Sequence, residues 1–168
     1  TTDIFGTLTN NTINNAYYGI FLQSSTSPKS RRWTITGNSI NNAYYMASYL
    51  YFHDSIAINN NNFNVGSYTT GTYGIYTTGL AGTVNINKNR VFVPNGGYGL
   101  YLATSLASTT PRTLVSNNFL AVGGTVGTSY GMWINSGTWY ADIMNNSVNV
   151  TNTASLGSYA LYMSASSF

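Results

Sequence analysis

The sequence has no cysteine and very little charge. Among its 168 residues there are six Lys or Arg and three Asp or Glu. Without cysteine, the chain has neither a disulfide framework nor a thiolate metal site. A nucleic-acid partner needs a dense basic surface that neutralises phosphates, and six dispersed cations do not supply one. No run of 18 apolar residues occurs, so we expect no membrane insertion through a transmembrane helix.

Most of the sequence consists of uncharged polar residues and apolar residues. Hydrophobic residues make up 43% of the sequence, which is enough to bury a core in one domain of this length. We therefore expect a single domain spanning 1–168. The repeat described next stops partway through a unit at both ends. We therefore also expect this domain to be a segment of a longer protein, or to be capped by partners.

A six-fold internal repeat dominates the sequence. Each unit carries an Asn followed two residues later by an apolar residue, and successive Asn residues are 27, 23, 28, 29 and 28 positions apart. A period in this range is typical of solenoid proteins. The six residues, called the ladder Asn below, are Asn11, Asn38, Asn61, Asn89, Asn118 and Asn146.

Apolar residues recur at fixed places around each ladder Asn. They alternate with polar residues, as in VNINKNRVFV (84–93), and such alternation predicts strands rather than helices. A third alternating segment follows in each unit, for example YGIFL in the first and YGLYL in the fourth. Three short strands per unit favour an all-β fold, a single-stranded parallel β-helix of about six coils.

The ladder Asn fit a corner of such a coil. Two apolar columns, three residues before and two residues after each Asn, keep a constant spacing, so the corner between these strands has a constant length. Asn tolerates the left-handed backbone that a tight corner needs. Stacked Asn amides can also hydrogen-bond from coil to coil. The sequence therefore predicts a structural Asn ladder.

Longer phrases resemble a known group of proteins. The N-x-Φ turn, the YGIYL-like strands and the stretch YGMWINSGTWYADIMNNSVNVTNT (130–153) are similar to right-handed parallel β-helix repeats in large secreted and cell-surface proteins of Bacteroidota. Members of that group are often type IX secretion substrates. The resemblance covers essentially the whole chain. It implies a right-handed solenoid, an extracellular or cell-surface location in bacteria, and a structural or adhesive role, on a fold shared with pectate-lyase-like enzymes.

The acidic residues argue against such an enzyme. Polysaccharide lyases and hydrolases on this fold are expected to use Arg or Lys bases with calcium, or clustered carboxylates. The chain has only Asp3, Asp54 and Asp142, and the repeat places them in different units. We therefore predict a non-catalytic protein with no cofactor and no metal site. A polysaccharide lyase or hydrolase is the lower alternative.

The triplet His53, Asp54 and Ser55 is interpreted as a short polar corner. In a Ser-His-Asp triad the Asp orients the imidazole of the His. Adjacent side chains of an extended chain alternate in direction, so Asp54 would point away from His53 and could not take this role. Asp54, Ser55 and Ile56 together are similar to the acceptor motif for O-glycosylation in Bacteroidota. Ser55 is therefore a candidate modification site.

The candidate binding site is a column of aromatic residues. In all six units an aromatic residue directly follows an aliphatic residue of the third strand, and in five of them a Gly or Ala lies beside it. If the aliphatic residues point into the core, the rings form an outward stripe on which sugars can dock. The alternatives are purely structural stacking between coils and contact with a protein partner. The residues predicted for this stripe are Phe21, Tyr51, Tyr76, Tyr101, Trp133 and Tyr162.

These features together predict an extracellular structural or adhesive module of a large bacterial surface or secreted protein. A glycan-binding module that uses the aromatic stripe is the alternative. The expected partners are the rest of a larger parent chain, neighbouring surface or secretion proteins, and glycans.

Overall fold

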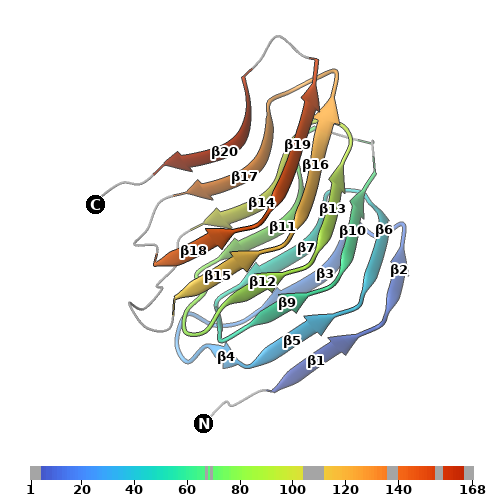
Figure 1. Ribbon diagram of the computed structural model, residues 1–168. Helices are drawn as coiled ribbons and strands as arrows, with labels where there is room; N and C mark the ends of the chain where they lie inside the picture. The colour runs from blue at the N-terminus through green and yellow to red at the C-terminus, as the bar shows by residue number, and fades with distance from the viewer. Residues whose placement is uncertain are drawn as a thin grey trace.

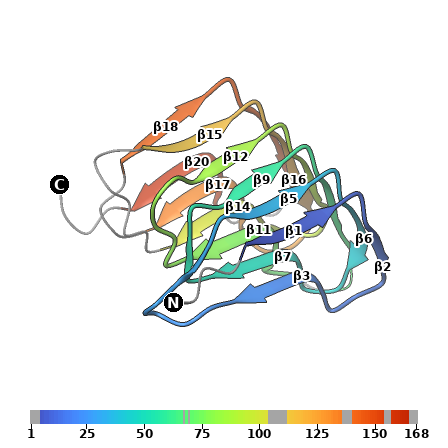
Figure 2. The same ribbon diagram turned by 90° about the horizontal axis from the view of Figure 1, so that it is seen from below.

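The computed structural model describes residues 5–66, 68, 70–103, 112–135, 140–153 and 157–164. Within these ranges the regular elements are β-strands, and strands of successive repeats pair in parallel. They form three sheets of six strands each, visible as three rows of arrows in Figures 1 and 2. Each coil contributes one strand to each sheet. The predicted all-β parallel solenoid with three short strands per coil is confirmed.

The first sheet contains the strands that precede the ladder Asn. One apolar residue of each strand belongs to a column that pairs in register from coil to coil, as Leu8 does with Ile35 and Ile35 with Ile58. This column is the one predicted from the repeat. The six strands are β1 (Gly6–Thr9), β5 (Trp33–Thr36), β9 (Ala57–Asn59), β12 (Asn85–Asn87), β15 (Thr113–Ser116) and β18 (Ala141–Met144).

The second sheet contains the strands that follow the ladder Asn. Its core column includes Phe63, which is fully buried and pairs in register with Ile40 on one side and Val91 on the other. Mostly polar residues alternate with this column and face outward, together with the exposed Phe92 and Phe119. The six strands are β2 (Thr12–Asn14), β6 (Ser39–Ala43), β10 (Asn62–Val65), β13 (Arg90–Val93), β16 (Phe119–Gly124) and β19 (Ser147–Asn152).

The third sheet completes each coil and has the longest strands. Its inner face carries aliphatic residues such as Leu100 and Leu102, both fully buried. Its outer face carries the aromatic rings described below. The six strands are β3 (Tyr18–Gln23), β7 (Met46–Tyr51), β11 (Thr72–Thr78), β14 (Gly97–Ala103), β17 (Ser129–Asn135) and β20 (Ser158–Ser164).

A small additional sheet joins the loops of the first two coils. It consists of β4 (Ser30–Arg31) and β8 (His53–Asp54), which pair in parallel. The triplet predicted as a polar corner therefore begins with a short strand, and His53 is buried there.

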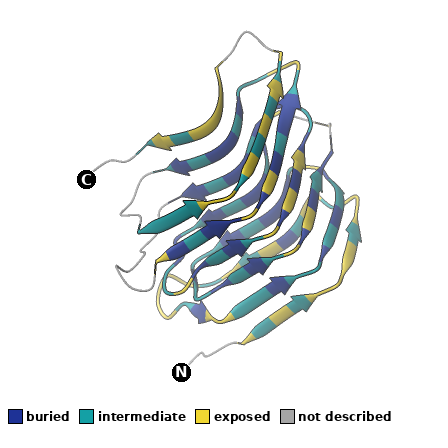
Figure 3. Cartoon of the chain, in the orientation of Figure 1, coloured by how far each residue is buried: buried dark blue, intermediate teal, exposed yellow. Residues whose placement is uncertain are grey.

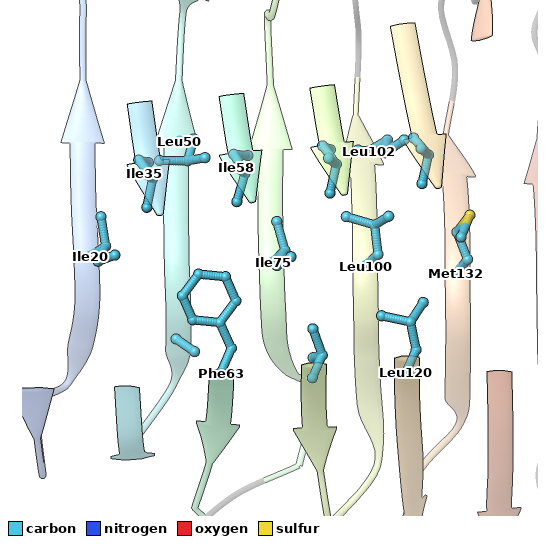
Figure 4. Packing of buried hydrophobic residues seen from close by; sticks show 14 of the residues in the cluster. Ile20, Ile35, Leu50, Ile58, Phe63, Ile75, Leu100, Leu102, Leu120 and Met132 are labelled. Atoms are coloured by element: carbon cyan, nitrogen blue, oxygen red, sulfur yellow. The ribbon is translucent and has the colours of Figure 1, made fainter. Parts of the chain in front are cut away.

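The core is a continuous stack of side chains along the coil axis. Ile75, Leu100 and Met132 of the third sheet lie opposite Phe63 and Leu120 of the second (Figure 4). Strands of the middle coils are largely buried, whereas β1 alternates between intermediate and exposed residues and β20 is largely exposed (Figure 3). The middle coils are covered on both sides, so the hydrophobic stabilisation is concentrated there.

The ladder Asn form a continuous hydrogen-bonded column. In each step the side-chain Nδ2 donates to Oδ1 of the next ladder Asn, at 2.9–3.0 Å. The backbone N–H of the same residue donates to the same Oδ1. In five coils Nδ2 also donates to a carbonyl of the first sheet. The predicted Asn ladder is confirmed.

The left-handed backbone of this corner lies one residue earlier than predicted. The sequence analysis assigned it to the ladder Asn, but positive φ angles of 54–67° occur at the residue before each of them. This residue makes the bend, and its side chain is not part of the ladder. The ladder Asn that follows is then placed with its amide along the coil axis. The left-handed residues are Asn10, Gly37, Asn60, Lys88, Asn117 and Asn145.

Candidate functional site

The outer face of the third sheet carries a column of six rings, one from each coil. Four of them, from Phe21 to Tyr101, lie parallel in succession, with ring centroids 4.9–5.0 Å apart. Trp133 is roughly perpendicular to Tyr101 at 5.3 Å and to Tyr162 at 5.1 Å. This outer column consists of Phe21, Tyr49, Tyr76, Tyr101, Trp133 and Tyr162.

The second member of this column is Tyr49, and the prediction of Tyr51 was wrong by two residues. Tyr49 pairs in register with Phe21 and Tyr76, whereas Tyr51 pairs with Gln23. A register shift of two residues leaves every side chain on the same face, so alternation alone does not distinguish the two alignments. The ring of Tyr51 stacks beside Tyr49 at 5.9 Å and extends the aromatic surface sideways.

A second column of rings lies beside the first, and the sequence analysis missed it. Tyr73, Tyr98 and Tyr130 stack almost parallel, with centroids 4.5 and 5.0 Å apart. The signal was present in the sequence, since a Tyr precedes the Gly or Ala of the third strand in most units. This inner column consists of Tyr18, Tyr45, Tyr73, Tyr98, Tyr130 and Tyr159. We call the two columns together the aromatic face.

Glycine allows both columns to point outward. Tyr73 and Tyr76 are three residues apart, yet both are half-exposed, with ring centroids 5.1 Å apart. Strict alternation would send one of them inward. Gly74 lies between them, and a Cβ there would be 2.0 Å from Cγ1 of Val91 on the second sheet. Glycine at position 74 lets the strand pack this closely while it changes which face its residues occupy. In the second and sixth coils the small side chains of Ala47 and Ala160 stand at the equivalent position.

Stacking hides the faces of the interior rings and exposes their edges. In the inner column Tyr98 has a parallel ring on each side, Tyr73 at 4.5 Å and Tyr130 at 5.0 Å. In the outer column Tyr76 lies between Tyr49 and Tyr101 in the same way. A sugar that stacks on an aromatic residue needs an open ring face. The aromatic face therefore offers ring edges and hydroxyls instead of the flat platform expected from the sequence.

The aromatic face suppresses ionisation of Tyr73 and Tyr76. Burial, with a smaller contribution from the neighbouring Tyr side chains, raises the pKa of Tyr76 to about 12. The same causes raise the pKa of Tyr73 still further. A phenolate in this array would be poorly hydrated and close to further phenolates.

We expect the aromatic face to weaken at high pH. The pKa of Tyr76 in the folded protein lies above its unfolded value near 10. The contribution of its neutral hydroxyl to the free energy of unfolding is therefore complete below about pH 10 and is lost as the pH rises through about 12. In a spectroscopic titration of phenolate absorbance, the native protein should ionise fewer of its 15 tyrosines near pH 10 than the chain in denaturant. The denaturant midpoint should fall over the same pH interval. Native and denatured titrations that coincide would contradict the stacking.

His53 and its neighbours do not form a catalytic triad. Nδ1 of His53 lies 2.6 Å from Oγ of Ser30, and Nε2 lies 3.1 Å from the carbonyl oxygen of Leu22. Burial lowers the pKa of His53, so its neutral ring donates from Nε2 to Leu22 and accepts from Ser30. Asp54 pairs instead with Arg31, at 3.4 Å between Oδ2 and Nε. The prediction that Asp54 does not orient the imidazole is confirmed.

The hydroxyl of Ser55 already has two hydrogen-bond partners. Its Oγ donates to Oδ1 of Asp54 at 2.8 Å and accepts from the backbone N–H of Thr83 at 3.2 Å. The residue is half-buried and has a φ of 60°. A glycan on Ser55 would have to replace the bond to Asp54. O-glycosylation at this position stays a prediction.

The two described carboxylates are far apart. Asp142 lies on β18, and three strand-to-strand steps lead from it to Ala57, three residues after Asp54. At ~4.8 Å per step the axial separation is about 14 Å. Acid and base carboxylates of glycoside hydrolases lie roughly 5–9.5 Å apart. Asp3, the third acidic residue, lies outside the described residues.

These features define a parallel β-helix protein: the strands of each of the three sheets pair in parallel, an Asn ladder runs through the coils, and aromatic columns stack along one face. The chain belongs to the NosD family, since the family model for "Periplasmic copper-binding protein (NosD)" matches residues 4–164. No curated protein and no solved structure matches the chain. The described residues include no helix with the length and apolar character to cross a membrane.

The donor groups of the described residues do not fit a copper ion. Protein copper sites use imidazole, thiolate and thioether ligands. The chain has no Cys, and both ring nitrogens of its single His, His53, already have partners. Met46 and Met132 are buried, and the exposed Met144 and Met163 have no Cys and no available His to join them as ligands. The parts of the chain with described structure contain no group of three or more His, Cys, Asp or Glu able to hold a metal. We therefore assign no copper-dependent role to these residues.

Proposed function

We propose that this chain is a non-catalytic structural and adhesive module of a bacterial envelope, surface or secreted protein. The observation that supports it is that many of the polar and aromatic groups of the described residues make contacts between coils. The ladder Asn and the aromatic columns connect one coil with the next, and the two described carboxylates form salt bridges in different coils. Such an arrangement builds a stiff rod with a repetitive surface and leaves no paired acid and base.

The location and partners form part of this proposal. A family described as periplasmic is compatible with an exported protein, and we extend the location to the cell surface or exterior. Export by type IX secretion in a member of the Bacteroidota belongs to the same proposal. We propose as partners the rest of a larger parent chain or neighbouring surface proteins. Exposed apolar side chains of β20, Leu161 and Met163, support a contact surface at the sixth coil.

The absence of catalysis can be tested directly. With polyuronates as substrates, we expect no ultraviolet absorbance from unsaturated products, and no new reducing ends with neutral polysaccharides. The reason is the separation of Asp54 from Asp142 and the salt bridge that each forms. Turnover that persists after repeated purification, and that is lost in Asp54→Asn or Asp142→Asn, would overturn the proposal. Turnover that neither variant changes would be examined in Arg31→Gln, Arg90→Gln and Arg112→Gln, because a lyase on this fold would use an Arg or Lys base, and its loss in any of them would also overturn the proposal.

Glycan binding by the aromatic face is the second candidate function. It is favoured by the continuous rows of Tyr hydroxyls, which can hydrogen-bond to a neutral sugar chain running along the axis. A glycan array should then show binding that decreases at least about ten-fold in Trp133→Ala and Tyr101→Ala. Tyr68→Ala is the control, because Tyr68 is exposed and lies in another stack, with Tyr44. If the array shows no binding, glycan binding by the aromatic face is rejected and the scaffold role is the candidate that is left.

A further inference from the structure

A groove on the outer face of the second sheet gathers a cation, open rings and free amides. It has a volume of about 160 Å³. Arg90 pairs in register with Asn62 on β10 and with Phe119 on β16, and Phe92 pairs with Asn64. The outward residues of three neighbouring strands therefore meet at one place. The lining residues are Asn62, Asn64, Arg90, Val91, Phe92 and Phe119.

Arg90 carries a positive charge that no described carboxylate compensates. The two described acidic residues pair elsewhere, Asp54 with Arg31 at 3.4 Å and Asp142 with Arg112 at 2.7 Å. Arg90 instead lies over Phe119, with its guanidinium carbon 5.9 Å from the ring centroid. This contact holds the guanidinium at the groove and leaves N–H donors for a ligand.

The two phenylalanines of the groove differ from the rings of the aromatic face. Phe92 is 49% exposed and Phe119 is 41% exposed, and among the described residues neither ring contacts another aromatic ring. Phe119 contacts the guanidinium of Arg90, whereas among the described residues no cation lies over the half-exposed ring of Phe92. Ala121 pairs in register with Phe92, and its small side chain leaves space beside that ring. An apolar ligand face can therefore stack on Phe92.

Amide groups complete the groove. Asn62 is exposed at its edge. Asn64 donates from Nδ2 to Oδ1 of Asn41 at 3.4 Å, which is a long contact and leaves its carbonyl oxygen open. Amides of this kind both donate to and accept from hydroxyl groups. The groove thus combines one full positive charge, one half-exposed aromatic ring and neutral hydrogen-bonding groups.

From this combination we propose that the groove binds a carboxylated pyranose, such as a uronic-acid residue of an acidic polysaccharide. The carboxylate pairs with the guanidinium of Arg90, the C–H face of the sugar ring packs on Phe92, and Asn62 and Asn64 contact ring hydroxyls. This inference rests on the adhesive role proposed above and names its ligand class. Binding needs no metal and changes no covalent bond.

Isothermal titration with trigalacturonic acid and with its fully methyl-esterified form tests the charge requirement. We expect the acid to bind, and the ester to bind at least about ten-fold more weakly, because esterification removes the negative charge that pairs with Arg90. Binding of the acid should weaken as the salt concentration rises. Arg90→Gln and Phe92→Ala should each lower the affinity for the acid by about ten-fold or more. A trisaccharide of neutral sugars that carries sulfate esters in place of carboxylates shows whether the groove selects carboxylates or binds any anion.

Arg112→Gln is the matched control, since it changes the net charge by the same amount at a site paired with Asp142. It should bind as the wild type does, and thermal unfolding of each variant checks that the fold is retained. Equal affinity for acid and ester, equal losses in Arg90→Gln and Arg112→Gln, or stronger binding of the sulfated sugar would overturn the inference. If only Tyr101→Ala lowers the affinity for the acid, the ligand binds at the aromatic face and the groove is not its site. No binding of any probe up to about 10 mM would also overturn it, while the substrate assays of the proposed function would stand.

Discussion

Replacing Asn89 by alanine should lower the free energy of unfolding by about 3–5 kcal/mol. Oδ1 of Asn89 accepts from the backbone N–H and from Nδ2 of Asn61, at 3.1 and 2.9 Å. Its Nδ2 donates to Oδ1 of Asn118 at 3.0 Å and to the carbonyl of Ile58 at 2.7 Å. Alanine removes these four bonds in a fully buried place, so several polar groups lose their partners at about 1–3 kcal/mol each.

The matched control for this substitution is Asn11→Ala at the exposed end of the same ladder. Asn11 donates from its backbone N–H and from Nδ2 to Oδ1 of Asn38. Water reaches Asn11, so alanine there should cost about 1 kcal/mol or less. Urea unfolding followed by circular dichroism measures both variants. If the two substitutions cost the same, the ladder would not be a buried, water-free column.

Replacing Gly74 by alanine should cost about 3 kcal/mol, the upper part of the usual range for overpacking. The new Cβ would lie 2.0 Å from Cγ1 of Val91 and 2.7 Å from the carbonyl oxygen of Gly99. The valine methyl can turn aside only by disturbing the core. The carbonyl belongs to the backbone of the next coil, so it moves only if the two coils separate. We therefore expect lower stability together with weaker near-ultraviolet dichroism from the tyrosine stacks.

The same column supplies the control for this prediction. Ala160 occupies the equivalent position on β20 and is exposed, so Ala160→Gly should change stability by about 1 kcal/mol or less. Val91→Ala in the Gly74→Ala background should restore part of the loss. The two substitutions should therefore be coupled in a double-mutant cycle. Additive effects, or a Gly74→Ala protein as stable as the wild type, would show that Gly74 is not in close contact with Val91.

The repeat made most of the fold predictable from the sequence. The constant spacing between each ladder Asn and its two apolar neighbours, three residues before and two residues after it, determines which residues of successive coils pair. The pairing of Leu8 with Ile35 and of Ile40 with Phe63 follows that spacing. The sequence restricts the residue types at these positions because each must both fit the backbone conformation and fill a buried place. A residue that does not meet both requirements lowers the stability of the fold.

The details of the candidate sites were less predictable. Tyr49 and Tyr51 face the same way, so only the pairing of whole strands decides which of them joins the outer column. The inner column escaped notice because strict alternation places Tyr73 and Tyr76 on opposite faces, and the close approach of Gly74 to Val91 changes this. Arg90, Phe92 and Asn64 come from two different coils, and no local pattern marks them as neighbours.

The Asn ladder also has an electrical direction. In every step Nδ2 donates toward the later coil and Oδ1 accepts from the earlier one, as between Asn61 and Asn89. The carbonyl ends of the amides therefore point toward the first coil, and the amide hydrogen that is donated along the ladder points toward the sixth. Aligned amide dipoles add up as they do in an α-helix, which gives the rod a weak macrodipole. Cations are favoured near Asn11 and anions near Asn146, so the two ends of the rod are electrostatically different even though their folds are alike.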